Sequence, residues 1–328
     1  NLVYMKILIT GSSGFIGSNL LKLLNSNNHT IISLDKNIDK NIICKKSYEL
    51  DINNIDDIPS DDANGIDCII HLAAVHKDNI KPVDLYYKTN YIGTNKVINF
   101  ASKYKINKII FTSTVAIYGV DVNGCCENDT PNPFNDYGRS KIMAENKLNE
   151  WYKLNKSRTL IIIRPTVVFG PKNRGNVYNL ISQINNKKFI MIGKGNNKKS
   201  LAFVDNLVMF ILVTLDLNKG IFVYNYSDKP DLKIKNLIHQ IYNSLNLKKN
   251  RLYIPKYVGL LSGIFLDIFQ KIVNHQFNIS YIRIKKFTSS SVVSISKLQK
   301  DFPDLKNVDL NKAIDLTINA DFKNKEIK

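Results

Sequence analysis

The stretch from Lys6 to Leu20 constrains the fold more than any other part of the chain. It begins with a short apolar run, Ile7 to Ile9, which is typical of a strand buried in a parallel sheet. A glycine-rich turn follows, and apolar residues then recur at helical spacing. This order predicts a phosphate cradle, because glycine permits a tight turn and a helix N-terminus presents free N–H groups. The residues expected at the phosphates are Gly11, Ser13, Gly14, Phe15, Ile16 and Gly17.

A second apolar strand, Thr30 to Leu34, ends at Asp35, which lies 18 residues after Gly17. Folds of this kind place an acidic residue on the adenosine ribose at about this distance. A carboxylate there accepts hydrogen bonds from both ribose hydroxyls and repels a 2′-phosphate. The sequence therefore favours NAD(H) as the cofactor, and Lys36 beside the acid leaves NADP(H) open.

Three later segments supply further cofactor candidates. The pair Asp51-Ile52 either flanks the adenine or belongs to a loop. The apolar strand that begins at Asp67 ends in small residues, which leave room for a cofactor lying across the strand end. His71 on that strand has no visible acid or metal partner in the sequence, so we interpret it as a packed residue. The candidates from these and later segments are Asp51, Ile52, Leu72, Ala73, Ala74, Asn90, Tyr137, Lys141 and Pro165.

Strands and helices alternate through the first half of the chain, with helical patterns at 83–104 and 136–151 and apolar strands at 108–111 and 160–163. Such alternation predicts a doubly wound parallel α/β sheet. We expect a dinucleotide-binding domain at 5–171, to which 201–226 returns. Residues 172–200 and 227–328 should form a smaller, mostly helical substrate lobe over the open edge of the sheet.

Composition narrows the class of protein. The 328 residues are 44% hydrophobic and 23% charged, as in a soluble globular protein. No apolar run reaches the roughly 18 residues of a membrane span, and no signal peptide pattern opens the chain, so a cytoplasmic protein is expected. The four cysteines lack metal-ligand spacing, which predicts reduced thiols and no metal site.

The net charge of +18 raises two questions about partners. Basic residues are spread along the whole chain, so we do not expect nucleic acid to bind; the charge would instead attract an anionic nucleotide substrate. The apolar segment 258–273, with Arg283 and Lys285 nearby, could dock on a membrane surface. Because Asp267 interrupts the apolar run, we expect a core helix of the substrate lobe instead.

The reacting residues are predicted from position more than from spacing. Four Tyr-x-x-x-Lys pairs occur in the chain, beginning at Tyr104, Tyr137, Tyr152 and Tyr281, so the spacing alone identifies nothing. Tyr137 begins a helix directly after a loop and follows the hydroxyl-rich strand end at Thr112-Ser113-Thr114. Lys141 lies one turn further along the same helix face.

These residue types suit the transfer of a proton at a sugar hydroxyl. A nearby ammonium and a positive nicotinamide ring both favour the phenolate, which lowers the pKa of the tyrosine toward working pH. Such an acid-base group contributes roughly 10²–10⁴ in rate. The hydroxyl of Thr114 could hold the reacting oxygen. We therefore predict Thr114, Tyr137 and Lys141 as the catalytic residues.

At these residues the chain resembles the extended short-chain dehydrogenase/reductases, in the nucleotide-sugar epimerase/dehydratase group. The resemblance covers essentially the whole length. It rests on Gly11-Ser-Ser-Gly14-Phe-Ile-Gly17, His71-Leu-Ala-Ala74, Tyr137-Gly-Arg-Ser-Lys141 and Arg164-Pro-Thr-Val-Val-Phe-Gly-Pro171. It implies a Rossmann fold, a UDP-linked sugar substrate and a homodimer formed through the helices 83–104 and 137–151.

The same resemblance implies where the sugar nucleotide binds. Asn176 is similar to the asparagine that meets the substrate diphosphate, and the segment 198–205 to the one that usually carries a diphosphate-binding arginine. Lysine stands there in this chain, a point charge in place of a planar fork. The implied substrate contacts are Ser113, Thr114, Asn176, Val177, Lys199 and Arg283.

Departures from the family pattern narrow the expected reaction. Family members that dehydrate hexoses carry an Asp-Glu pair where this chain has Val115 and Ala116, which cannot move protons. Oxidoreduction at C4 of the sugar remains. The segments at 174–180 and 197–201 look like reductases of UDP-4-keto-6-deoxy-N-acetylhexosamines in surface-polysaccharide pathways. We expect that reductase. The alternative is a 4-epimerase of a UDP-hexose or UDP-N-acetylhexosamine with tightly bound NAD, and a remote alternative is a non-catalytic nucleotide-binding regulator.

Overall fold

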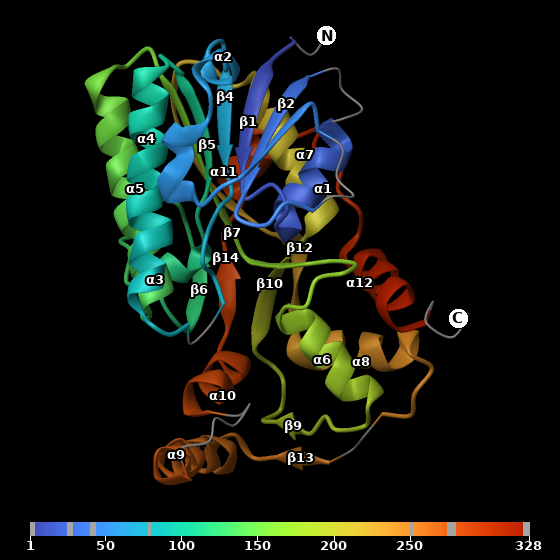
Figure 1. Cartoon of the computed structure of the whole chain (residues 1–328). Coiled ribbons are helices and arrows are strands. Elements are labelled where there is room, and N and C mark those ends of the chain that lie inside the picture. Colours follow the sequence, from blue (N-terminus) through green and yellow to red (C-terminus); the bar gives the residue numbers. More distant parts are fainter. Residues whose placement is uncertain are drawn as a thin grey trace.

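The computed structural model describes residues 4–24, 29–39, 44–77, 80–249, 252–273 and 280–323. Its centre is a seven-stranded parallel sheet in the order β11-β7-β5-β4-β1-β2-β3 (Figure 1). The strand order reverses at β1, with β2 on one side and β4 on the other. The strands are β1 (Lys6–Thr10), β2 (Thr30–Asp35), β3 (Lys46–Glu49), β4 (Cys68–His71), β5 (Lys108–Thr112), β7 (Thr159–Pro165) and β11 (Gly220–Tyr226).

Helices cover both faces of this sheet, as Figure 1 shows. Ile7 and Ile9 of β1 pack in one apolar cluster with α1 and α7, whereas Leu8 packs in a second cluster with α4 and α5. Both faces of the strand are therefore buried, which explains its uninterrupted apolar run. The doubly wound α/β fold predicted from the sequence is confirmed. The bounds are α1 (Phe15–Leu24), α4 (Gly93–Lys103), α5 (Asp136–Leu154) and α7 (Val204–Val213), with the shorter η1 (Ile52–Asp57), α2 (Ser60–Ala63), α3 (Asp84–Tyr86), η2 (Tyr87–Ile92), η3 (Val115–Tyr118) and η4 (Thr214–Asp216).

The substrate lobe lies beyond the C-terminal ends of the sheet strands, in the lower half of Figure 1. Its core is formed by α6, α8 and α12, which bury Ile181, Ile238 and Ile314 together. The elements here are α6 (Asn176–Asn185), α8 (Ile234–Ser244), α9 (Lys256–Val273), α10 (Tyr281–Thr288), α12 (Leu310–Ile318) and η5 (Asn319–Lys323), while α11 (Ser296–Asp301) packs on the large sheet.

This lobe contains more strand than the sequence pattern predicts. A second sheet has the order β12-β10-β14-β6, with β8 beside β10, and a third pairs β13 with β9. The pattern misses most of these strands because they are short and carry no alternation of apolar and polar residues; β12, for example, has the sequence DKPDLK. The domain boundaries drawn at 171 and 227 stay a prediction. The strands are β6 (Val122–Cys125), β8 (Val167–Phe169), β9 (Met191–Ile192), β10 (Lys198–Phe203), β12 (Asp228–Lys233), β13 (Tyr253–Ile254) and β14 (Ser291–Val293).

Candidate active site

The glycine turn between β1 and α1 lies at the point where the strand order reverses. Gly11 has a φ of +72°, and a Cβ there would lie 2.5 Å from the backbone nitrogen of Ala73. A Cβ on Gly17 would lie 2.2 Å from the carbonyl oxygen of Gly11. The turn therefore packs against the exit of β4 on one side and against its own helix on the other. The first-turn N–H groups of α1, at Phe15 and Ile16, have no intrahelical partner and can bind an anion.

Asp35 ends β2 beside this turn. Its carboxylate accepts a hydrogen bond from the backbone nitrogen of Ser13 at 3.0 Å and another from that of Asn37 at 3.1 Å. A carboxylate offers about four acceptor positions, so two remain for the hydroxyls of a ribose. The ammonium of Lys36, whose side chain is largely exposed, lies 3.9 Å from the carboxylate of Asp51, just beyond the neighbouring strand β3.

Asp51 and Ile52 lie next to that ribose position, because β3 pairs with β2 and Leu50 donates to the carbonyl oxygen of Asp35. Asp51 caps η1 by accepting from the backbone nitrogen of Asn53 at 3.0 Å. Burial raises the pKa of Asp51, but the bonds from Asn53 and the charge of Lys36 outweigh it and the pKa is lowered. Ile52 is buried against α4, so its side chain belongs to the core.

Asn90 holds the chain after β4 in place. Its amide accepts from the backbone nitrogen of Val75 at 2.8 Å and donates to the carbonyl oxygen of Val75 and to the hydroxyl of Ser140, each at 2.9 Å. The residue sits in the π-helical η2 (Tyr87–Ile92), an irregularity often found at functional sites. The loop that starts with Leu72, Ala73 and Ala74 is thereby fixed against α5.

His71 is a packed residue, as predicted. Its Nδ1 lies 2.7 Å from the hydroxyl of Thr10 and its Nε2 lies 3.0 Å from that of Thr94. Burial, reinforced by the charge of Lys141, lowers the pKa of His71 to about 3. The imidazole is therefore neutral, and both of its nitrogens are occupied by hydroxyl partners.

Tyr137 and Lys141 lie in the first turns of α5. The helix is capped by Asn135, whose side chain accepts from the backbone nitrogen of Gly138 at 2.9 Å. The ring of half-buried Tyr137 is tilted against that of Tyr86, with centroids 6.4 Å apart. Lys141 is fully buried, and its ammonium lies 3.9 Å above the ring of Phe111 on β5. Burial lowers the pKa of Lys141 to about 7, against the opposing charge of Glu145.

Thr114 reaches the same place from the end of β5. It is buried, and its Oγ1 accepts from the backbone nitrogen of Ala116 at 3.1 Å, which leaves the hydroxyl hydrogen for another acceptor. A Cβ on Gly138 would lie 2.8 Å from the carbonyl oxygen of Ala116. The glycine therefore lets α5 approach the loop of Thr114 closely. The structure brings the three predicted catalytic residues to the C-terminal end of the sheet strands, next to β5.

Four buried hydroxyls line this end of the sheet without a partner. Within the described parts of the chain, the Oγ atoms of Ser12, Ser113 and Ser227 and the Oγ1 of Thr166 are buried and make no hydrogen bond. Ser113, Thr166 and Ser227 directly follow β5, β7 and β11, and Ser12 is the second residue after β1, at the end where doubly wound folds bind ligands. Unpaired buried hydroxyls are costly, so their grouping fits a site that a polar ligand completes. Sequence reasoning found Ser113 but missed the other three.

The predicted substrate contacts outside the large sheet differ in how far they are exposed to solvent. Lys199 on β10 donates to the carbonyl oxygen of Lys286 at 2.7 Å, and burial lowers its pKa to about 8. Asn176 is exposed at the first position of α6, and Arg283 is exposed on α10. Val177 is buried in the lobe core, so only its backbone can touch a ligand. Pro165 ends β7, directly before Thr166.

A buried ion pair that the sequence did not predict supports α5. Arg164 on β7 donates from Nη2 to Glu145 Oε2 at 2.6 Å and from Nε to Oε1 at 3.1 Å. Its Nη1 donates to the hydroxyl of Tyr118 and to the carbonyl oxygen of Glu127. Because Glu145 lies one turn beyond Lys141, the pair anchors the helix that carries the candidate catalytic residues. In the sequence, the sign of this pair is an acidic residue, Glu145, four residues after Lys141 on the same helix face.

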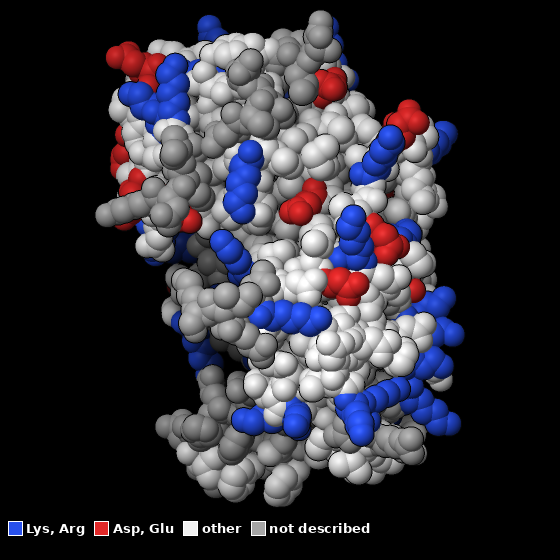
Figure 2. All heavy atoms as spheres, turned by 90° about the vertical axis from the view of Figure 1, so that its right-hand side faces the viewer, with Lys and Arg blue, Asp and Glu red and all other residues white. Residues whose placement is uncertain are grey.

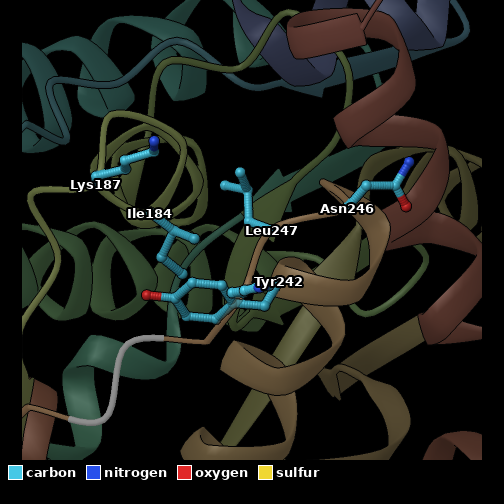
Figure 3. A pocket seen from close by; sticks show the side chains of 6 residues that line it. Ile184, Lys187, Tyr242, Asn246 and Leu247 are labelled. Atoms are coloured by element: carbon cyan, nitrogen blue, oxygen red, sulfur yellow. The ribbon is translucent and has the colours of Figure 1, made fainter.

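Two hollows of the described structure lie away from the candidate site. One, of about 390 Å³, opens between the C-terminal ends of α6 and α8, where Ile184, Tyr242 and Leu247 meet (Figure 3). Lys187 and Lys248 stand at the same hollow. None of the predicted site residues lines it. The candidate site is therefore identified by its chemistry and its place in the fold.

Comparisons with known proteins identify the family of the chain. The family model described as "NAD dependent epimerase/dehydratase family" matches residues 7–225. The chain is 40% identical over 299 residues to the N-acetyl-alpha-D-glucosaminyl-diphospho-ditrans,octacis-undecaprenol 4-epimerase of Escherichia coli O157:H7, covering 89% of this chain and 88% of that one. It is 29% identical over 270 residues to UDP-glucose 4-epimerase of Vibrio cholerae, covering 78% and 81%.

Among solved structures, the UDP-glucuronic acid 4-epimerase of Bacillus cereus in complex with NAD superimposes with a TM-score of 0.75. The identity is 21%, and the match covers 96% of this chain and 98% of that one, so it shows a shared fold. Together with the family model and the 40% identical relative, these matches span both the sheet and the substrate lobe. The chain belongs to the NAD-dependent epimerase/dehydratase family.

Proposed function

We propose that the protein is an NAD-dependent 4-epimerase of an N-acetylhexosamine joined to its carrier through a diphosphate, with a polyprenyl lipid as the carrier. The observation that carries this proposal is the 40% identity, over 89% of the chain, to the lipid-linked N-acetylglucosamine 4-epimerase of Escherichia coli O157:H7. The relatives favour the epimerase alternative over the reductase expected from the sequence. A UDP-linked sugar shares the same diphosphate chemistry and is the second candidate substrate, because other relatives are UDP-sugar epimerases.

NAD(H) is the cofactor of this family, and the residues at the turn after β1 suit it. The turn has no room for a side chain at Gly11 or Gly17 and would hold the pyrophosphate on the N–H groups of Phe15 and Ile16. Asp35 has free acceptor positions for the ribose hydroxyls. When bound, NAD supplies reversible hydride transfer at C4 of the sugar.

Tyr137 is the proposed acid-base residue. Its phenolate oxygen would take the proton of the C4 hydroxyl as the sugar is oxidised and return it to the C4 oxygen when the sugar is reduced on its other face. Lys141 would stabilise the phenolate through its charge, since the two residues lie one helical turn apart. The free hydroxyl hydrogen of Thr114 would hold the reacting oxygen.

The two residues after Thr114 argue against loss of water from the sugar. Dehydration needs a further acid and base beside the reacting carbon. The chain after Thr114 continues as Val115-Ala116 at the start of η3, and neither side chain has an ionisable group that could donate or accept a proton. The proposed reaction is therefore confined to oxidation and reduction at one carbon.

A dimer through α4 and α5 also stays a proposal. The helices pack side by side on one face of the sheet (Figure 1). Ile92, which ends η2 directly before α4, and Met143 of α5 are exposed. Exposed apolar residues on adjacent helices suit pairing with a second copy. Light scattering would show about twice the monomer mass if the proposal is correct.

Coenzyme and substrate assays together test the proposed function. The purified protein is denatured and the released nicotinamide nucleotide is identified. The native protein is incubated without added coenzyme with polyprenyl-diphospho-N-acetylglucosamine in detergent and, separately, with UDP-N-acetylglucosamine. We expect stoichiometric NAD and interconversion at C4, with the lipid-linked substrate turned over faster. Coenzyme oxidation that requires a 4-keto sugar and added NADH or NADPH would instead establish the reductase.

A further inference from the structure

Helix α9 presents its bulky apolar side chains to solvent. Leu261 and Phe265 are 67% and 68% exposed, respectively. Their neighbours recur at intervals of three and four residues, so they form one continuous stripe along the helix. This stripe, the apolar face, consists of Tyr257, Val258, Leu261, Ile264, Phe265 and Ile268. The prediction that this segment forms a core helix is therefore wrong, because these side chains are exposed.

The opposite side of α9 explains why the bulky side points outward. Gly259 and Gly263 are the buried residues there, and a Cβ on Gly263 would lie 2.8 Å from the Cα of Tyr281 on α10. A Cβ on Gly259 would lie 2.6 Å from a side-chain carbon of Ile192. The helix thus approaches the lobe closely through its glycines, and Leu260 and Leu266 are half-buried. A helix whose packing served only the lobe would bury its leucines and phenylalanines instead.

Asp267 does not interrupt the apolar face. Its carboxylate accepts from the backbone nitrogen of Tyr281, at the start of α10, at 3.1 Å, and from the side chain of Gln270 at 3.4 Å. The acidic group is therefore turned toward the lobe. The sequence suggested that it broke the stripe, because linear order does not show which side of the helix a residue occupies.

Basic residues surround this end of the lobe. On the side seen in Figure 2, only Lys and Arg are visible among the charged residues at the lower end. The parallel pairing of β13 with β9 brings the basic segments that precede the two strands, 187–188 and 248–249, to the same end of the lobe. The exposed residues of this basic rim are Lys187, Lys188, Lys194, Lys248, Lys249 and Lys256. An apolar helix face with basic surroundings complements a bilayer that contains anionic lipids.

We propose that the apolar face of α9 docks the protein on the surface of an anionic lipid bilayer. Among the described helices none is both long and apolar enough to traverse a bilayer, so the helix would lie in the interface. Docking itself does not depend on the reaction; only the delivery of a lipid-carried sugar to the site rests on the proposed function.

Helix α10 links the docking helix α9 to the candidate site, so docking would place the candidate site near the bilayer. Helix α10, which packs on α9, carries Lys286, whose carbonyl oxygen accepts from Lys199 and whose ammonium lies 4.9 Å above the ring of Phe134. Phe134 stands three residues before Tyr137. Through α10, the membrane-facing helix α9 is thus connected to Lys199, the implied diphosphate contact, and to the loop that leads to the proposed acid-base residue.

Flotation with vesicles tests the docking. The full-length protein is mixed with vesicles of phosphatidylglycerol and phosphatidylethanolamine, and in parallel with vesicles of phosphatidylcholine alone. We expect binding to the anionic vesicles, weakened by salt. The double variant Leu261→Asp, Phe265→Asp should bind about tenfold less or weaker still, since it loses two apolar anchors and gains two repelled charges. Leu154→Asp, at an exposed leucine on α5, is the matched control and should bind normally.

Two results would overturn the inference. The first is that the wild-type protein does not bind the anionic vesicles. This includes the case in which the apolar face instead holds two copies of the chain together and the double variant is a monomer. The second is a double variant that binds as well as the wild type. Circular dichroism checks that the variants fold.

Activity separates this inference from the proposed function. The double variant should epimerise a detergent-dispersed substrate at the wild-type rate but a vesicle-borne one about tenfold more slowly. Wild-type protein that binds vesicles yet turns over neither substrate would refute the proposed function and leave docking standing.

Discussion

Replacement of Glu145 by glutamine should destabilise the protein strongly. The side chains of Arg164 and Glu145 are only 8% and 1% exposed, and they share two hydrogen bonds. Glutamine keeps the shape but removes the charge and turns an N–H group toward a cation that has only donors. Loss of one partner of a buried pair costs roughly 3–5 kcal/mol. That is a large part of the roughly 5–15 kcal/mol that stabilises a typical domain.

Urea denaturation followed by circular dichroism measures this loss. Glu150→Gln is the matched control, because Glu150 lies on the same helix and pairs with Lys147 at 2.8 Å but is 61% exposed. Such a surface pair contributes less than about 1 kcal/mol. The reasoning fails if the two variants lose similar, small amounts of stability. Replacing both members of the buried pair, with Glu145→Leu and Arg164→Met, should recover much of the loss.

Three further outcomes are expected. Gly17→Ala should release bound coenzyme, measured by absorbance after filtration, because the new Cβ would lie 2.2 Å from a backbone oxygen of the turn; unchanged coenzyme content would contradict this. Asp35→Ser should raise the proportion of NADP among the coenzyme that copurifies, since the charge that repels a 2′-phosphate is gone; an unchanged proportion would count against the ribose assignment. Lys141→Met should stabilise the fold more at about pH 6 than at about pH 9: the folded pKa of Lys141 is about 7, so the cost of burying its charge is full below that pH and declines toward the unfolded pKa. Equal stabilisation at both pH values would argue against a buried ammonium.

The Rossmann half of the molecule could be read from the sequence because its determinants are local. The apolar run at Ile7, the glycines after it and Asp35 at the next strand end each fix one step of a known topology. The substrate lobe was harder because its strands are short and pair far along the chain: β6 meets β14 across about 170 residues. Such pairings leave no periodic pattern in either partner.

The candidate site shows the same division. Tyr137, Lys141 and Thr114 can be predicted as candidates because a family motif and a strand end mark them; the structure places them at the C-terminal end of the sheet strands, and their catalytic role stays a proposal. Glu145 and the orphan hydroxyls of Ser12, Thr166 and Ser227 were missed, since their importance lies in burial, which composition and spacing do not reveal. The outward apolar face of α9 was misjudged for the same reason. In each case the missing information is which side of an element faces the interior.

The most direct test of the account is the turnover of Tyr137→Phe, with coenzyme content measured on the same preparation. The variant keeps the ring that packs on Tyr86 and loses only the oxygen proposed to move the proton at C4. We predict that NAD stays bound while the rate of C4 epimerisation falls by roughly 10²–10⁴. A variant that retains NAD and epimerises at the wild-type rate would contradict the central claim.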